Sequence, residues 1–131
     1  MSPDLPLRVN LTALENIALA EQYHQALSWT RASARAQRLL DRCGNGDIAL
    51  QRDEDLSFTQ RFAVKLARAI QLQRPLLVID RPALLLADIF YPPVLGTLLA
   101  DLADEYPAHL VLDYAWHQPL YAHPASNGNL P

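Results

Sequence analysis

The sequence has little cysteine, little glycine, no dense run of basic residues and no long apolar run. A single cysteine, Cys43, stands among 131 residues, which excludes an intramolecular disulfide and a multi-thiolate zinc site and suits a reducing, cytoplasmic compartment. No apolar stretch approaches the ~18 residues that span a bilayer, so direct membrane insertion is not expected. Eleven basic residues against fourteen acidic ones give a net charge of −3, so nucleic acid is not an expected partner.

Hydrophobic residues are abundant, at 50% of the chain, so there is enough apolar material for a core. A length of 131 residues predicts one domain, residues 1–131. The expected fold class is α/β, with a mostly helical N-terminal part followed by a small parallel βαβ unit. The helical part is predicted over residues 10–73 and the βαβ part over residues 74–114. Residues 115–131 are predicted to form a tail.

Two helices are predicted before the middle of the chain. Thr12 and Glu15 have the spacing of a capping box, in which each side chain bonds the backbone amide of the other residue. A helix is therefore expected over about residues 12–24. The second helix is expected over about residues 28–43, because Gly44 can take the left-handed conformation that ends a helix.

A third helix is predicted over residues 58–73, since Ser57 and Gln60 repeat the capping-box spacing. One face of this helix is apolar. The opposite face carries a row of basic side chains, and these fit either of two interpretations: a solvated helix face or contacts with phosphates. The row consists of Arg61, Lys65 and Arg68.

Two short strands and a helix between them are predicted next. Residues 76–79 are a continuous apolar run of strand length, which is typical of a strand buried on both faces, and this pattern places Val78 in the core. A helix is expected over residues 93–106 and a second strand over residues 109–113. A strand, helix and strand in this order form a right-handed βαβ unit with parallel strands.

Asp80 is the first candidate for a functional residue. It directly follows the first predicted strand, and open α/β sheets bind ligands at the carboxyl ends of their strands. The alternative interpretation is that its side chain caps the following turn.

Three segments carry a resemblance to a known family. They are Leu56-Ser-Phe-Thr-Gln-Arg61, Val64-Lys-Leu-Ala-Arg-Ala-Ile70 and Leu76-Leu-Val-Ile-Asp-Arg-Pro82. Together they resemble the C-terminal half of an ATP-binding cassette (ABC) ATPase, in which a signature Leu-Ser-Gly-Gly-Gln heads a helix carrying Ala-Arg-Ala and a Walker B strand ends in Asp-Glu-Pro. Residues 11–19 are similar to the segment after the family's Q-loop. The resemblance spans about residues 10–114 and implies nucleotide contacts for Ser57 and Gln60 and a magnesium-linked carboxylate at Asp80.

The departures from the family's pattern concern its catalytic parts. Phe58 and Thr59 stand in place of the two signature glycines that let backbone amides approach a phosphate. Arg81 stands in place of the water-polarising glutamate and has no basic lone pair. Tyr114 replaces the switch histidine, and the D-loop aspartate position falls on Ala87. No Gly-x-x-x-x-Gly-Lys-Ser/Thr phosphate loop occurs in the sequence.

These departures lead to the prediction that the protein is not an enzyme and has no cofactor of its own. The leading hypothesis is a degenerate, non-hydrolysing accessory or regulatory subunit of a transporter. One alternative is a soluble, self-associating interaction module without a transport role. Another is weak binding of Mg-ATP in trans, with Ser57, Gln60 and the Phe58 amide facing an intact ATPase; simple helix capping is the competing interpretation of Ser57 and Gln60.

A partner is expected in either case, because a two-stranded sheet leaves open edges and apolar faces. We expect a homodimer, or a complex with an ABC ATPase or a permease. The location is then cytoplasmic, with membrane association through a partner. The side chains expected to pack against that partner are Leu84, Leu85, Leu86, Ile89 and Phe90.

Overall fold

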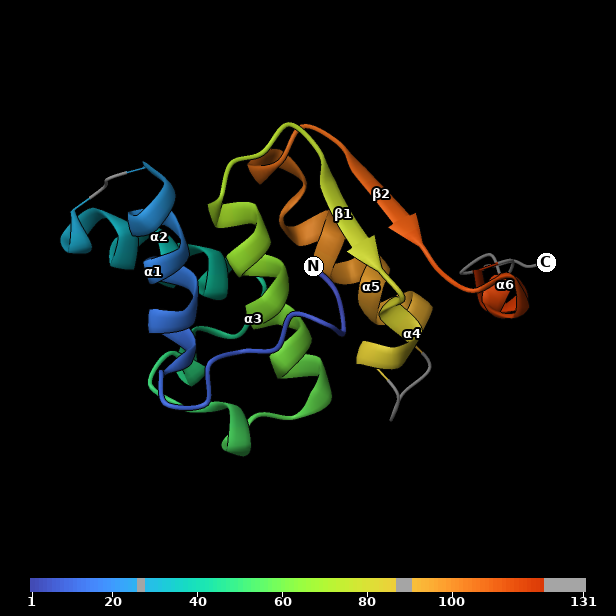
Figure 1. Cartoon of the computed structure of the whole chain (residues 1–131), viewed down its shortest axis with the longest axis horizontal. Coiled ribbons are helices and arrows are strands. Elements are labelled where there is room, and N and C mark those ends of the chain that lie inside the picture. Colours follow the sequence, from blue (N-terminus) through green and yellow to red (C-terminus); the bar gives the residue numbers. More distant parts are fainter. Residues whose placement is uncertain (26–27, 87–90, 122–131) are drawn as a thin grey trace.

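The computed structural model describes residues 1–25, 28–86 and 91–121. Its helical part consists of three α-helices packed against one another, with α3 beside both of the others (Figure 1). Two short 3-10 helices lie in the connection between the second and third α-helices. The elements of this part are α1 (Ala13–Gln25), α2 (Trp29–Arg42), η1 (Gly46–Ile48), η2 (Asp53–Asp55) and α3 (Phe58–Gln71).

The predicted helix ends are confirmed by their hydrogen bonds. At the start of α1 the Thr12 amide donates to Glu15 Oε1 at 2.9 Å, and the Glu15 amide donates to Thr12 Oγ1 at 3.1 Å. At the start of α3 the Ser57 amide donates to Gln60 Oε1 at 2.9 Å, and the Gln60 amide donates to Ser57 Oγ at 3.1 Å. Gly44 follows α2 with a φ of +75°, a conformation that glycine adopts without strain.

A parallel βαβ arrangement follows the helical part, as predicted. The strands pair in parallel, with Ile79 opposite Val111. The connection contains an unpredicted turn of helix directly after the first strand, and the main helix begins and ends a few residues before its predicted bounds. The elements are β1 (Leu77–Asp80), α4 (Pro82–Leu85), α5 (Tyr91–Asp101), η3 (Ala103–Glu105) and β2 (His109–Leu112).

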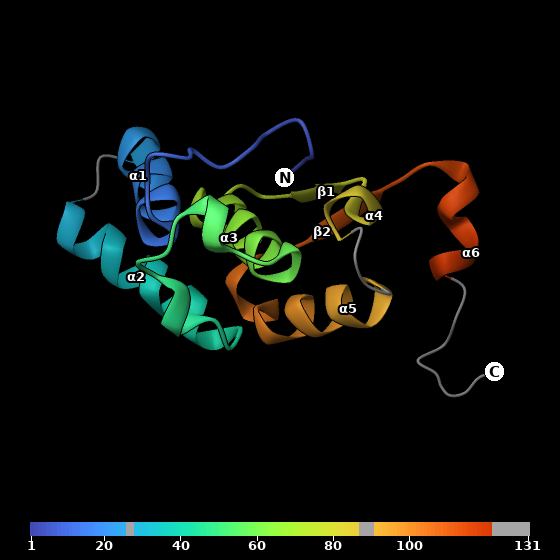
Figure 2. The same cartoon turned by 90° about the horizontal axis from the view of Figure 1, so that it is seen from below.

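The sheet is covered on one face, which corrects the prediction of a strand buried on both faces. α5 runs along that face in both views (Figures 1 and 2). Leu77 and Ile79 point into the core and are buried, whereas Val78 lies on the other face and is half-buried. On the same face Leu110 and Leu112 are each 47% exposed. A continuous apolar run therefore does not mark a doubly covered strand here; we name the face with Val78, Leu110 and Leu112 the open face.

The core joins both parts of the chain in one hydrophobic cluster. Phe62 of α3 is 1% exposed and has the largest of its fully buried side chains. Leu86 is 1% exposed and belongs to this cluster, so the expectation that it packs against a partner is wrong. Leu85 packs partly against the cluster, while Leu84 is 46% exposed. Ile89, Phe90 and the D-loop position Ala87 lie outside the described residues.

The chain after β2 runs away from the helical part (Figures 1 and 2). It contains η4 (Ala115–His117) and α6 (Gln118–Tyr121), where a tail was expected. Residues 122–131 lie outside the described part. Within the described residues, no helix is both long enough and apolar enough to cross a bilayer.

Candidate functional site

The site candidate Asp80 lies at the carboxyl end of β1, and its carboxylate is bound by neighbouring donors. Arg81 Nε donates to both carboxylate oxygens at 3.2 and 3.3 Å, and Arg81 Nη2 donates to Oδ2 at 3.1 Å. Ser2 Oγ also donates to Oδ2, at 3.0 Å. The hydrogen bonds from Arg81, with that from Ser2, lower the pKa of Asp80 below its usual range. Asp80 is therefore held as a carboxylate that already faces a cation.

Arg81 connects the ends of the two strands and the N-terminal segment. It has a φ of +51°, in the left-handed region, and its amide donates to the Leu112 carbonyl at 2.6 Å. Its guanidinium forms an ion pair with Asp4 and lies 3.5 Å from the Tyr114 hydroxyl. Bonds to Asp80, Tyr114 and Asp4 raise the pKa of Arg81 above its ordinary value. The structure thus brings together three predicted site positions, Asp80, Arg81 and Tyr114.

The first residues of the chain were not predicted to be near this site. The Met1 nitrogen donates to the Val78 carbonyl at 2.6 Å, and the Asp80 amide donates to the Met1 carbonyl at 2.9 Å. This pair of bonds flanks Ile79 in the pattern of a parallel ladder. Met1 therefore occupies part of the β1 edge that faces away from β2, and Ser2 and Asp4 follow it into the site. More than seventy residues separate them from Asp80 and Arg81 in the sequence, so no local sequence pattern could predict these contacts.

The signature-like residues at the start of α3 are not joined to this site. Ser57 and Gln60 form the capping box, which supports the capping interpretation of both side chains. Phe58 is 43% exposed, and the Arg61 guanidinium lies 5.6 Å from its ring centroid. Thr59 is half-buried. Among the described residues, no hydrogen bond or ion pair connects this group with Asp80.

The basic row on α3 is not the solvated face that one interpretation expected. Arg61 Nε donates to Asp53 Oδ1 at 2.6 Å, and Arg61 Nη2 donates to the Asp53 and Leu56 carbonyls. Arg68 donates to the carbonyls of residues 5 and 6 in the N-terminal segment. Lys65 is buried, with 4% of its surface exposed. The row is packed within the molecule because loops cover both sides of α3, which a helical periodicity does not reveal.

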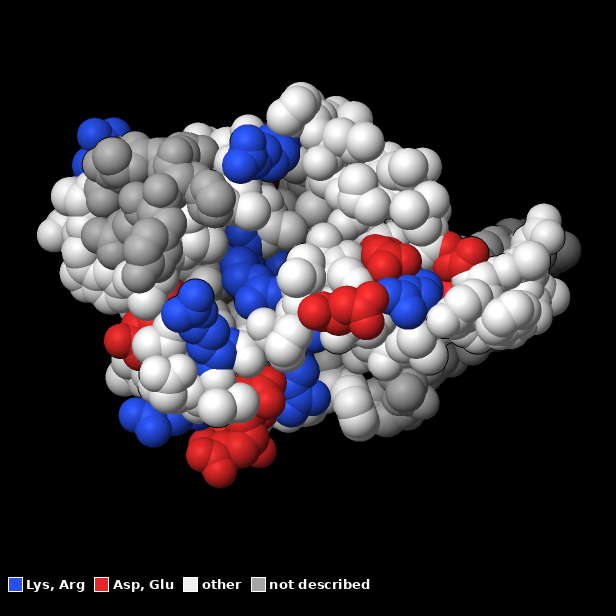
Figure 3. Space-filling view, viewed as in Figure 1, with Lys and Arg blue, Asp and Glu red and all other residues white. Residues whose placement is uncertain are grey.

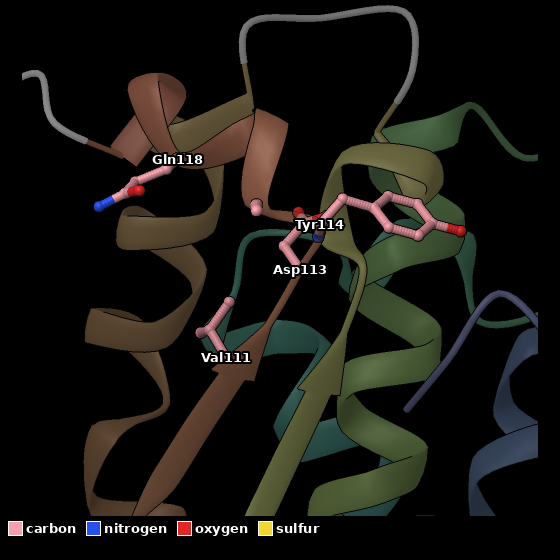
Figure 4. Close-up of a pocket in the computed structure, with 5 residues that line it drawn as sticks. Val111, Asp113, Tyr114 and Gln118 are labelled. Atoms are coloured by element: carbon pink, nitrogen blue, oxygen red, sulfur yellow. The ribbon is translucent and has the colours of Figure 1, made fainter.

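A cavity of about 300 Å³ lies beside the end of β2 (Figure 4). Asp113 accepts hydrogen bonds at 2.7 Å from its neighbour's amide and pairs with His117 Nδ1 at 2.7 Å. The ring of Tyr114 points away from Gln118 in Figure 4 and stacks on Trp116 at a centroid distance of 4.3 Å. In the described ranges, no cluster of three or more His, Cys, Asp or Glu side chains could hold a metal.

Comparison with known proteins relates this fold to a transporter cassette. No family model and no curated protein matches the chain. Two solved structures of the ATP-binding cassette MJ0796 are similar to it, and both are dimeric. One is a post-hydrolysis state bound to ADP and Pi, with a TM-score of 0.66, 26% identity, and coverage of 85% of this chain and 49% of that chain. The other, described as a bacterial ABC transporter cassette, has a TM-score of 0.64, 26% identity, and coverage of 87% and 51%. The chain spans about half the length of these cassettes.

Proposed function

Since the chain has the fold of part of an ABC ATPase domain, we propose that it is a non-hydrolysing accessory or regulatory subunit of a transporter. The observation that carries this proposal is the pairing of Asp80 with Arg81. In an ATPase of this kind the corresponding carboxylate serves a magnesium ion, and the next residue polarises a water. Here the next residue is Arg81, whose guanidinium donates hydrogen bonds to that carboxylate.

The residues at this position do not fit bound magnesium. A magnesium ion takes oxygen ligands in octahedral geometry. Both Asp80 oxygens already accept hydrogen bonds, from Arg81 and from Ser2, and the guanidinium brings a positive charge against any incoming cation. No catalytic step is therefore derived through a metal or a nucleotide. Binding of Mg-ATP in trans stays a prediction, and the engagement of Ser57 and Gln60 in the capping box argues against it.

The first test is phosphate release by the purified chain in Mg-ATP. We expect release at the background rate, both for the natural chain and for Arg81→Glu, because a restored glutamate does not supply the missing phosphate loop. Release that grows with protein concentration and disappears in Asp80→Asn would contradict the proposal. The Asp80→Asn control removes the carboxylate charge with little change in size, so it separates true turnover from a contaminating ATPase.

The proposed partner is a permease, reached through the helical part. This part exposes large apolar side chains in its loops: Val9 is 71% exposed and Leu50 is 80% exposed. The backbones that carry them are adjacent, since Thr12 and Arg52 form an antiparallel bridge. Exposed apolar side chains that lie close together are typical of interaction surfaces. On this proposal the chain reaches the cytoplasmic side of a membrane through its partner.

The second test is affinity capture from detergent-solubilised membranes of the source cell, followed by mass spectrometry. We expect the tagged chain to retain a permease. A Val9→Asp/Leu50→Asp double variant should retain at least about tenfold less permease, because two buried apolar contacts are worth more than 1.4 kcal/mol. Leu112→Asp is the matched control, since it places a charge on the open face and leaves the helical part unchanged. Equal retention by all three proteins would count against the docking surface.

A second candidate function is self-association through the open face. It is favoured by Leu110 and Leu112, which lie side by side in the exposed strand. If the capture experiment recovers the chain alone, and Leu112→Asp reduces that recovery, the self-associating module is the better interpretation and the transporter role is wrong.

A further inference from the structure

Lys65 is a buried lysine on α3. It is the only lysine in the sequence, and 4% of its surface is exposed. Within the part of the chain that the structure describes, no hydrogen bond or ion pair is found for its ammonium group. Lysine is almost never buried unless it is paired, because the charge loses its hydration. Since the Lys65 ammonium nitrogen is not among the fully buried atoms that lack a hydrogen-bond partner, the charged end of the side chain reaches solvent while its stem is covered.

The basic neighbours of Lys65 on α3 do not share this property. Arg61 is paired with Asp53, and Arg68 directs two guanidinium nitrogens at backbone carbonyls of the N-terminal segment, at 2.9 and 2.6 Å. Burial, together with the positive charges of Arg68 and Arg61, lowers the pKa of Lys65 below its ordinary value, while the charge of Asp53 acts in the opposite direction. Of these three side chains, only Lys65 has no hydrogen bond or ion pair with a described residue.

Lys65 lines a cavity of about 270 Å³ between the N-terminal segment, α1 and α3. Apart from Lys65, Arg68 and the N-terminal ammonium of Met1, which donates to the Val78 carbonyl, the described residues in its wall are apolar, and none is acidic. In the space-filling view, basic side chains gather near a hollow in the middle of this face (Figure 3). The described wall is formed by Met1, Leu5, Pro6, Ala20, Lys65, Arg68, Ala69 and Leu72.

A second cavity, of about 400 Å³, adjoins the first, because the two share Leu5, Ala20 and Arg68. Its other described lining residues include Arg8 and Asn16, and again none is acidic. Asn16 is occupied: its amide group bonds the Arg8 backbone in both directions, at 2.8 and 3.2 Å. The described residues of the second cavity thus add apolar wall and the cation Arg8, and no carboxylate is among them.

We propose that these joined cavities bind a small amphiphile with a single carboxylate, whose head pairs with Lys65 and whose alkyl chain lies along the apolar wall. Among the cations of the first cavity, the Lys65 ammonium is the one without a hydrogen bond to a described residue, so a single carboxylate is enough to pair with it. The leucine and alanine side chains of the wall favour an alkyl chain over a polar body. This site shares Met1 with the edge of β1 but does not use Asp80 or Arg81, and it does not depend on the proposed transporter role.

The test is a calorimetric titration of the full chain with decanoate, with decanol and inorganic phosphate as comparison probes. We expect decanoate to bind, and to bind at least about tenfold more weakly to Lys65→Met, because hydrogen bonds to charged groups contribute about 1.5–3 kcal/mol. Arg31→Met is the matched control, since Arg31 is exposed on α2. This variant should bind decanoate as tightly as the natural chain does. Methionine keeps the length of the side chain and removes the charge, so Lys65→Met is expected to fold.

A measurement on the natural chain makes the test independent of that variant. With one lysine in the sequence, reductive methylation followed by peptide mapping reads a single side chain. Decanoate should slow methylation of Lys65 at least about tenfold relative to decanol, because a paired and covered amine is a poor nucleophile. Equal binding of decanoate and decanol, phosphate binding tighter than decanoate, unchanged binding to Lys65→Met, or no protection of Lys65 would each overturn the proposal.

Discussion

Ile79→Asp abolishes the folded state. Ile79 lies in β1, opposite Val111 of β2, and is fully buried. Its side chain points to the face of the sheet that α5 covers. A carboxylate at this position has no donor to pair with, and burying it costs several kcal/mol. That cost is comparable with the roughly 5–15 kcal/mol that stabilise an entire domain. The variant should be insoluble, or should lack a cooperative thermal transition in circular dichroism.

The control for this prediction is Leu112→Asp, a charge of the same kind on the neighbouring strand. Leu112 is 47% exposed on the open face, so its carboxylate reaches water. We expect this variant to fold, with a melting temperature within a few degrees of the natural chain. If Ile79→Asp melts cooperatively at the same temperature as Leu112→Asp, the covered face of the sheet is wrongly assigned.

Phe62→Ala has the second-largest expected effect, a loss of about 3–5 kcal/mol in the free energy of unfolding. Phe62 is 1% exposed and lies on α3, which packs against α1 and α2. Removing its ring costs the transfer energy of the buried atoms and leaves a cavity that the surrounding helices fill only in part. Urea denaturation monitored by circular dichroism measures the change, and an unaltered slope against urea would show that the denatured state is the same.

Phe58→Ala is the matched control, because it removes the same ring one helical turn earlier. Phe58 is 43% exposed and contacts the Arg61 guanidinium at 5.6 Å, an interaction worth about 0.5–1 kcal/mol at exposed sites. We expect a loss no greater than this. A Phe58→Ala variant as unstable as Phe62→Ala would mean that the start of α3 is buried in solution.

The local structure was largely predictable from the sequence. The capping boxes at Thr12 and Ser57 depend on residues three positions apart, and the glycine after α2 acts on its own backbone. The order of strand, helix and strand follows from composition, and its parallel pairing from the chirality of such connections. The family's fold was predicted from three short segments in the right order.

What the sequence did not predict depends on residues far apart in the chain. The donors around Asp80 include Ser2, 78 positions away, and Arg81 meets Asp4, 77 positions away. The burial of Lys65 follows from loops that cross α3, whereas its spacing with Arg61 and Arg68 indicated a polar face. The apolar run of β1 was equally compatible with one or two covered faces, because the exposure of Val78 is set by which elements lie over it.

The position of Met1 beside Ile79 ties the edge of the sheet to the charge at its end. Any further strand that adds to this edge of β1 must displace Met1, since both need the Val78 carbonyl and the Asp80 amide. Displacing Met1 also withdraws Ser2 from Asp80 and Asp4 from Arg81, which are the next residues of the same segment. A strand that adds to the β1 edge and a ligand that binds the Asp80 carboxylate therefore each compete with the N-terminal segment. By thermodynamic reciprocity, whatever binds Asp80 in place of Ser2 also weakens the binding of this segment to the β1 edge.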